Sequence, residues 1–184
     1  MTLTQLFAAI RASYIAVLAA AVDKDSVHVE PAYRNADGLL SLEGNPALPC
    51  RADWIPVEGE FAGQSHTVDA KTQLEFEPLS FQLSATKVSI VPFTWDWLPL
   101  QISSLTHVLA EATLVQWFTT WFDGEDKNAR NAEGLYGVVH FMSAITQEDQ
   151  ALQVSIDLGS VSEAALEDLL FKLADGKAQS IQLG

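Results

Sequence analysis

Basic residues are scarce in this sequence. The chain has 10 Lys and Arg against 24 Asp and Glu, which gives a formal net charge of −14 over 184 residues. Nucleic acids and anionic lipid surfaces are bound through positive patches, so this charge argues against both as direct partners. It suits a cytoplasmic protein, or a protein that binds a basic partner.

Cysteine is nearly absent as well. Cys50 is the single cysteine, so neither an intramolecular disulfide nor a cysteine metal cluster can form, and a reducing, cytoplasmic location is favoured. Arg51 follows directly and would lower the pKa of the thiol if both side chains were exposed. No other nucleophile signature surrounds Cys50, so we expect an inert thiol.

The usual catalytic and cofactor motifs are missing. The sequence contains no P-loop, no Gly-x-Gly-x-x-Gly, no His-Glu-x-x-His and no Gly-x-Ser-x-Gly. Nucleotide, dinucleotide, zinc-protease and serine-hydrolase functions therefore lose their usual support, and we expect no cofactor and no metal. No apolar run approaches 18 residues without a charge, so we predict no transmembrane span.

What the chain does have is a globular composition and a concentrated group of aromatic residues. With 48% hydrophobic and 18% charged residues, we expect a single domain over 1–184. Four of the five tryptophans fall between Val88 and Phe122. One apolar set there has the i, i+3, i+4, i+7, i+8 spacing of a helix: Leu114, Trp117, Phe118, Trp121 and Phe122. A strand over Thr113–Phe122 is the alternative, because Thr, Val, Trp and Phe favour sheets.

The start of this Trp-rich helix is less clear from the sequence. A second apolar set, which is out of phase with the first, consists of Leu105, Val108, Leu109 and Ala112. Either one helix is buried on two sides, or it breaks near Ala112. We expect Ser103 or Ser104 to cap its start and Asp123-Gly124 to end it.

Residues 3–22 form the second predicted helix, which Thr2 and Gln5 begin as a capping box. Its apolar stripe includes Phe7, Ile10 and Tyr14 and favours a core helix. The heptad-like spacing also allows a homodimer through helix 3–22. A signal peptide is a third alternative. Its positively charged N-terminal region would be poor, since Arg11 is the single basic side chain and comes late in the segment.

The remaining segments predict an α+β fold. Residues 23–66 are loop-rich, with short strands at Val27–Glu30, Leu39–Leu42 and Trp54–Val57, and residues 67–93 alternate as strands. Strands follow at Val138–Ile145 and Leu152–Leu158, then a helix that Ser160 and Glu163 cap, then a strand at Ile181–Leu183. We therefore predict a mainly antiparallel sheet packed by an N-terminal helix, a central Trp-rich helix and a C-terminal β-β-α-β unit.

An acidic stretch marks the C-terminal third. No Lys or Arg occurs from Asn131 to Phe171. If its acids share one face, that face would attract a basic partner, although they could serve solubility alone. Trp95-Asp96-Trp97 could add an exposed aromatic platform, with both rings on one side of an extended segment. The predicted binding residues are thus Trp95, Asp96, Trp97, Glu148, Asp149, Asp157, Glu163, Glu167 and Asp168.

Candidate catalytic residues are few. His107 and Glu111 stand four residues apart on the predicted helix, and His140 could join them around a metal ion, but a surface ion pair explains the spacing equally well. Asp123 is a further candidate for acid–base chemistry, beside Asp96 and Glu125. The three basic residues Arg34, Arg51 and Arg130 could each bind an anion, but no pattern in the sequence groups them.

Two functions remain on the sequence alone. The first is a small, acidic, non-enzymatic interaction protein, of an inhibitor or immunity type directed at a basic protein partner. The second is a small hydrolase-like enzyme with a cleft beside the Trp-rich segment, using His107, Glu111, Asp123 or His140.

Overall fold

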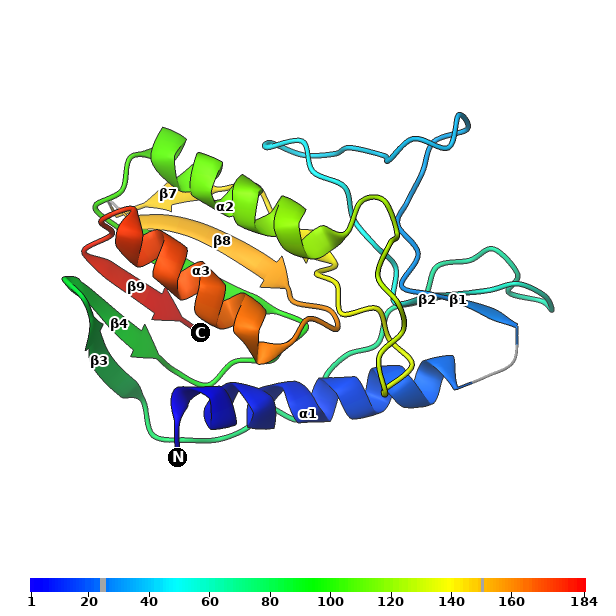
Figure 1. The fold of residues 1–184 in the computed structure, drawn as a ribbon, viewed down its shortest axis with the longest axis horizontal. Helices are drawn as coiled ribbons and strands as arrows, with labels where there is room; N and C mark the ends of the chain where they lie inside the picture. Colours follow the sequence, from blue (N-terminus) through cyan, green and yellow to red (C-terminus); the bar gives the residue numbers. More distant parts are fainter. Residues whose placement is uncertain (24–25, 150) are drawn as a thin grey trace.

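The fold is α+β, with helices packed on a mostly antiparallel mixed sheet (Figure 1). The structure is a computed structural model that describes residues 1–23, 26–149 and 151–184. The helices of these residues are α1 (Leu3–Val22), α2 (His107–Phe122) and α3 (Glu163–Asp175). α3 packs between α1 and α2, so the helical layer is continuous across the sheet.

The main sheet has the strand order β3-β4-β9-β5-β8-β6, and β7 also pairs with β8. Its strands are β3 (Leu79–Leu83), β4 (Thr86–Ile90), β5 (Leu98–Ser103), β6 (Phe141–Met142), β7 (Thr146–Glu148), β8 (Ala151–Asp157) and β9 (Ser180–Leu183). β4 and β9 pair in parallel, and the other neighbours are antiparallel. Alternate residues of β5 and β8 are buried, as expected for strands with one face against helices.

α1 begins and packs as the sequence predicts. The Thr2 hydroxyl accepts from the Gln5 amide, and the Gln5 side chain accepts from the Thr2 amide, which completes the capping box. The buried stripe includes Leu6, Ile10 and Tyr14, which lie in the core of the same chain. By length and composition α1 could also cross a membrane, a test that core helices and N-terminal signal sequences pass as well.

α2 confirms the predicted helix, but its first turns differ from the prediction. Thr106, rather than Ser103 or Ser104, is the N-cap, and its hydroxyl accepts from the Leu109 amide. Leu114, Trp117, Phe118 and Phe122 are buried, whereas Val108 and Leu109 are 76% and 44% exposed. The upstream apolar set is therefore not a second buried face, and the helix has one apolar side.

Several predicted strands are shorter or absent. Leu39–Leu42 and residues 67–78 contain no strand, and the predicted strand Val138–Ile145 is reduced to β6. Ser162, not Ser160, is the N-cap of α3, and it makes no side-chain capping bond. In the loop-rich segment, β1 (Val27–Val29) and β2 (Trp54–Pro56) pair antiparallel, apart from the main sheet.

β5 is the element that sequence reasoning missed. Leu98, Leu100 and Ile102 alternate with Pro99, Gln101 and Ser103, a strand pattern that the neighbouring aromatic residues obscured. The strand lies between β8 and β9, so it joins the C-terminal unit to the sheet centre. Without β5 the sequence could not give the sheet order.

Candidate functional site

A buried polar cluster around His140 is the most unusual feature of the structure. The His140 side chain is 1% exposed and lies just before β6. Its Nε2 is 2.7 Å from Oε1 of Glu30, which is fully buried. The other oxygen of Glu30 accepts from the Tyr136 amide at 2.7 Å. The imidazole ring is therefore held from one side by a carboxylate that is itself fixed.

Two aspartates lie on the other side of the His140 ring. Nδ1 is 2.8 Å from Oδ1 of Asp53 and 3.9 Å from Oδ2 of Asp157. Neither oxygen lies on the N–H direction of the ring, so Nδ1 has no aligned hydrogen bond among the described residues. The contact with Asp53 is thus electrostatic, and a buried ring nitrogen faces two carboxylates.

Asp53 is anchored by separate donors. Its Oδ1 accepts from the Tyr14 hydroxyl at 2.7 Å, and its Oδ2 accepts from the Val68 amide at 2.6 Å. Burial opposes the charge of Asp53, but contact with His140 and these hydrogen bonds outweigh it, so its pKa is lowered. Burial, together with the charges of Asp157 and Asp53, raises the pKa of Tyr14 well above its usual value.

The cluster raises the pKa of both His140 and Asp157, which favours the charged form of the histidine and the neutral form of the aspartate. Burial alone would lower the pKa of His140, but contacts with Asp53 and Glu30, together with the charge of Asp157, raise it to about 10. The pKa of Asp157 is also raised, because most of the carboxyl is desolvated and Asp53 lies nearby. The Asp157 side chain nevertheless keeps 21% of its surface exposed. Solvent can therefore reach the cluster at Asp157.

Gly159 allows β8 to approach His140. A Cβ at this position would lie 2.3 Å from Cδ2 of His140 and 2.4 Å from the Val138 carbonyl oxygen. The residue also has φ +53°, which glycine adopts without strain. Its amide donates to Oδ1 of Asp157 at 2.9 Å, so this glycine both admits the histidine and orients the aspartate.

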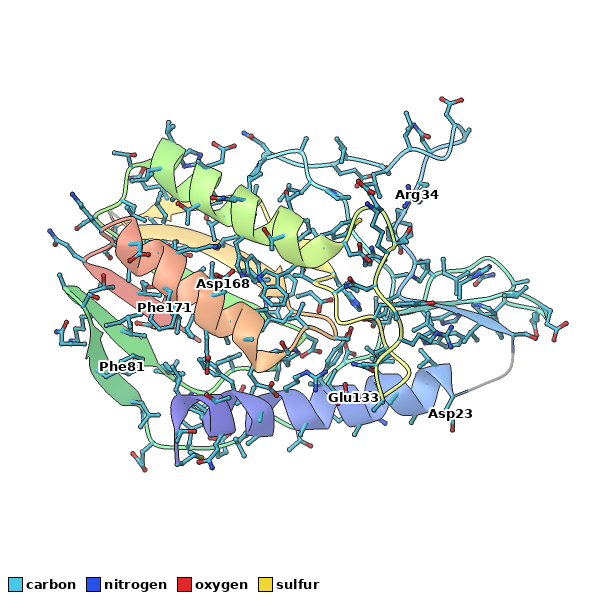
Figure 2. All side chains as sticks on the ribbon, in the orientation of Figure 1. Asp23, Arg34, Phe81, Glu133, Asp168 and Phe171 are labelled. Carbon is cyan, nitrogen blue, oxygen red and sulfur yellow. The ribbon has the colours of Figure 1, made fainter. Side chains whose placement is uncertain are left out.

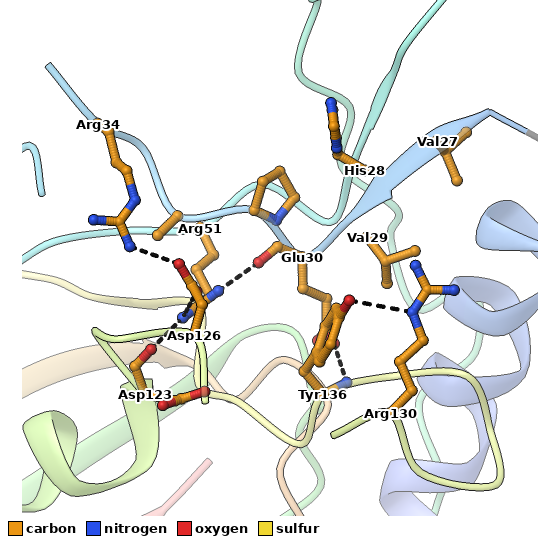
Figure 3. Close-up of a pocket in the computed structure, with 12 residues that line it drawn as sticks. Val27, His28, Val29, Glu30, Arg34, Arg51, Asp123, Asp126, Arg130 and Tyr136 are labelled. Atoms are coloured by element: carbon orange, nitrogen blue, oxygen red, sulfur yellow. Dashed lines mark hydrogen bonds and ion pairs between the residues drawn. The ribbon is translucent and has the colours of Figure 1, made fainter. Parts of the chain in front are cut away.

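A cavity of about 500 Å³ lies beside the cluster, on the backbone side of Glu30 (Figure 3). It brings together Arg34, Arg51 and Arg130, which the sequence left ungrouped. Arg51 is buried and donates to the Glu30 and Phe122 carbonyl oxygens and to Asp126 at 2.8 Å. Arg34 pairs with the other oxygen of Asp126 at 2.6 Å. Asp126 thus pairs with two of the three arginines, whereas Arg130 donates to the Tyr136 hydroxyl, and these contacts hold the cavity wall together.

An exposed aromatic pair lies at the solvent side of Asp157. Trp97 and Phe141 are 52% and 37% exposed, with ring centroids 6.3 Å apart and planes within 10°. Phe141 is the cross-strand neighbour of Asp157. We call Trp97 and Phe141 the aromatic patch. Trp95 does not belong to it, because the segment forms a turn that buries Trp95 completely, so the expected platform with both rings on one side was wrong.

The structure separates most of the predicted catalytic residues. His107 and Glu111 lie 3.8 Å apart on the outer side of α2, with no described cavity around them. Asp123 caps the end of α2, where its carboxylate accepts from the Lys127 and Asn128 amides, and it lines the 500 Å³ cavity. His140 is buried in the cluster, so the trio of His107, Glu111 and His140 weighed for a metal ion is not assembled.

The predicted acidic face is divided. Glu148 and Asp149 are exposed at the turn between β7 and β8, whereas Asp157 ends β8, roughly 20 Å away along the strand. Glu163, Glu167 and Asp168 lie on α3 (Figure 2). Asp168 pairs with Lys172 at 3.0 Å and accepts from Trp121, and Glu167 accepts from Thr4. One Asp96 oxygen accepts from the Ala70 amide, and the other is buried with no described partner.

Arg51 does not activate the Cys50 thiol. Burial, with the charge of Glu43, raises the pKa of the thiol, and Arg51 turns its guanidinium to carbonyl oxygens and Asp126 instead. The cysteine is therefore a weak nucleophile at neutral pH.

Sequence reasoning missed Tyr14, Glu30 and Asp53 as members of the cluster. They come from α1, the residue after β1 and the residue before β2, and no spacing in the sequence links them. The one faint signal is that Glu30 and Asp53 adjoin short apolar segments, although the sequence predicted a peripheral, loop-rich region there. No family model matches the chain, and no curated protein or solved structure matches it. The site must therefore be interpreted from its own geometry.

Proposed function

We propose that this chain is a non-enzymatic, cytoplasmic interaction protein that binds a basic protein through the aromatic patch. The observation that carries the proposal is the stacked, exposed pair of Trp97 and Phe141 on a protein of net charge −14. Exposed tryptophan is unusual on a surface without a binding role and is enriched among residues that dominate interface energies. The patch would be the centre of the interface.

Charge selects the partner. A Lys or Arg side chain from the partner can lie over the Trp97 ring, because the face of an aromatic ring attracts cations. Asp157, the cross-strand neighbour of Phe141, places a partly exposed carboxylate beside the same rings. The wider negative charge of the chain then increases the rate of encounter rather than forming the contact itself.

The test is affinity capture from cell lysate at low and high salt, with the wild type, Trp97→Ala and Phe171→Ala as baits. Phe171 is a matched control, since it is 55% exposed but lies on α3 (Figure 2). We expect a basic protein that the wild type and Phe171→Ala retain at low salt and release at high salt. Trp97→Ala should weaken its binding by roughly 30-fold, the effect of a strong interface residue.

Equal retention by Trp97→Ala and the wild type would remove the aromatic patch from the interface. Retention of no basic protein by any bait would contradict the proposal as a whole. Circular dichroism of each variant confirms that loss of binding does not reflect loss of fold.

A second candidate, the hydrolase-like enzyme, has support in one place. Asp157 combines partial exposure with a raised pKa beside the aromatic patch, and a carboxyl that stays protonated near neutral pH can act as a general acid. In this alternative His107, Glu111 and Asp123 have no role, because they lie elsewhere. Turnover of a chromogenic ester or glycoside that Asp157→Asn abolishes would favour the enzyme.

A further inference from the structure

One ring nitrogen of His140, Nδ1, contacts Asp53 at 2.8 Å without an aligned hydrogen bond. Nδ1 is buried and lacks an aligned hydrogen bond among the described residues, while Nε2 is held by Glu30 at 2.7 Å. A histidine that binds a metal through one nitrogen almost always donates from the other to a carboxylate or a carbonyl. Glu30 supplies such a carboxylate, and the Tyr136 amide fixes it.

The two aspartates surround this nitrogen at the spacing of metal ligands. Nδ1 of His140 and one oxygen each of Asp53 and Asp157 all lie within 4.8 Å of one another. Ligand atoms that share one ion at about 2.1 Å are roughly 3.0–3.5 Å apart at tetrahedral or octahedral angles. The distances of 2.8 Å and 3.9 Å from Nδ1 lie on either side of this range, so small side-chain rotations suffice.

The direction of the contact also fits an ion. Oδ1 of Asp53 lies close to Nδ1 but beside the axis of its N–H bond, which is poor geometry for a hydrogen bond. A metal ion bound to Nδ1 would lie on that axis. Oδ1 of Asp53, as a second ligand of the same ion, is then expected to lie to one side of the axis, as it does. Tyr14 and Val68 hold Asp53 in this position, and the Gly159 amide holds Asp157.

The local charge favours a cation. Glu30, Asp53 and Asp157 place three carboxylates around one imidazole, and Asp96 is close enough to act on Asp157. Arg51 does not compensate them, because it donates to the carbonyl oxygen of Glu30 and not to its carboxylate. An imidazole with two carboxylates is a ligand set that suits Zn²⁺ better than Mg²⁺ or Ca²⁺, which prefer oxygen ligands alone.

We propose that Nδ1 of His140, Asp53 and Asp157 form a binding site for a divalent transition-metal ion, Zn²⁺ in the first place. The ion takes the place of the proton on Nδ1, and Nε2–H stays on Glu30. Asp157, which is partly exposed, provides the way in, and a water molecule completes the coordination on that side. The site shares Asp157 with the proposed partner interface, but Zn²⁺ titration of the isolated protein tests it without any partner.

The first experiment uses the wild type alone. Metal is removed with EDTA, and Zn²⁺ is titrated while long-range ¹H–¹⁵N spectra of the histidine rings are recorded. The chain has 4 histidines, so each ring can be assigned. We expect one equivalent of Zn²⁺ to shift Nδ1 of His140 strongly and to leave the other three rings unchanged.

The second experiment compares variants by calorimetric Zn²⁺ titration and thermal unfolding. Asp157→Asn keeps the size of the side chain and should weaken Zn²⁺ binding by about 100-fold, since even outer partners of a metal site contribute 10- to 100-fold. Glu111→Gln is the matched control, because His107 and Glu111 are an exposed helical pair that could bind Zn²⁺ adventitiously. It should bind as the wild type does.

A Zn²⁺ concentration that just saturates the wild type should raise the unfolding temperature of the wild type and of Glu111→Gln, and should raise that of Asp157→Asn much less. The proposal is overturned if millimolar Zn²⁺ leaves the His140 ring unchanged in the spectra. It is equally overturned if Glu111→Gln loses the binding that Asp157→Asn keeps. Should Asp157→Asn fail to fold, the wild-type ring spectra alone decide between these outcomes.

Discussion

At the scale of single residues, the buried cluster depends on the missing side chain of Gly159. This glycine brings the end of β8 against the His140 ring, where no other residue would fit. Gly137, three residues before His140, also has a positive φ, of +70°. A Cβ at Gly137 would meet no atom within 4 Å, whereas a Cβ at Gly159 would clash. The two glycines therefore separate the effect of steric contact from the effect of backbone conformation.

Gly159→Ala should destabilise the protein by about 3 kcal/mol, because overpacking is added to the strain of a left-handed backbone. Gly137→Ala should lose only about 1 kcal/mol, from the backbone conformation alone. Urea unfolding followed by circular dichroism measures both free energies. Similar losses in the two variants would show that His140 moves aside easily and that the cluster is not tightly packed.

At the scale of elements, the helix N-termini differ in how they are capped. α1 has a complete capping box from Thr2 and Gln5, whereas α3 has Ser162 as N-cap without a side-chain hydrogen bond. Both residues have extended backbone and the hydroxyl that usually caps a helix. Only the position of the hydroxyl distinguishes them.

Thr2→Ala should therefore lower the free energy of unfolding by about 1 kcal/mol, since the Gln5 amide loses its acceptor. Ser162→Ala should change it by only a few tenths of a kcal/mol, because no capping bond is removed. Chemical denaturation gives both values. A loss at Ser162 as large as that at Thr2 would mean that its hydroxyl caps α3 in solution.

The same scale shows how far pattern recognition extends. The periodicity of α1, α2, β4 and β8 could be recognised in the sequence, because each of these elements buries one regular face. The sequence did not reveal β5. It also did not reveal that the predicted strand at Leu39–Leu42 is absent and that Val138–Ile145 is shortened to β6, because short segments take their conformation from their neighbours. The cluster was missed for a related reason: Tyr14, Glu30 and Asp53 meet only through packing.

At the scale of the whole molecule, net charge is the dominant electrostatic property. The ion pairs that the structure describes, such as Arg11–Glu133 and Arg34–Asp126, use a minority of the 24 acidic residues. The remaining acids repel one another across the surface and oppose the compact state. Salt screens this repulsion over about 10 Å at 0.1 M ionic strength.

Raising the ionic strength from a low value to about 0.5 M NaCl should therefore raise the thermal midpoint at pH 7. The expected increase is about 2–4 °C for each kcal/mol of repulsion removed. Repeating the scan at pH 5, closer to the isoelectric point of about 4.4, should shrink the increase. A midpoint that falls with salt at pH 7 would show that favourable ion pairs outweigh the net repulsion.

The sequence by itself determined the α+β class, the helices with a regular apolar face, the capping of α1 and the strong negative charge, because these depend on local spacing and on composition. Only the tertiary structure decided that Trp95 is buried while Trp97 is exposed, and that the acids of the base-free stretch are divided between the two ends of β8 and α3. It alone assembled His140 with Glu30, Asp53 and Asp157. The physical reason is that a buried polar cluster satisfies its hydrogen bonds and charges across long sequence separations, where no local pattern records the partners.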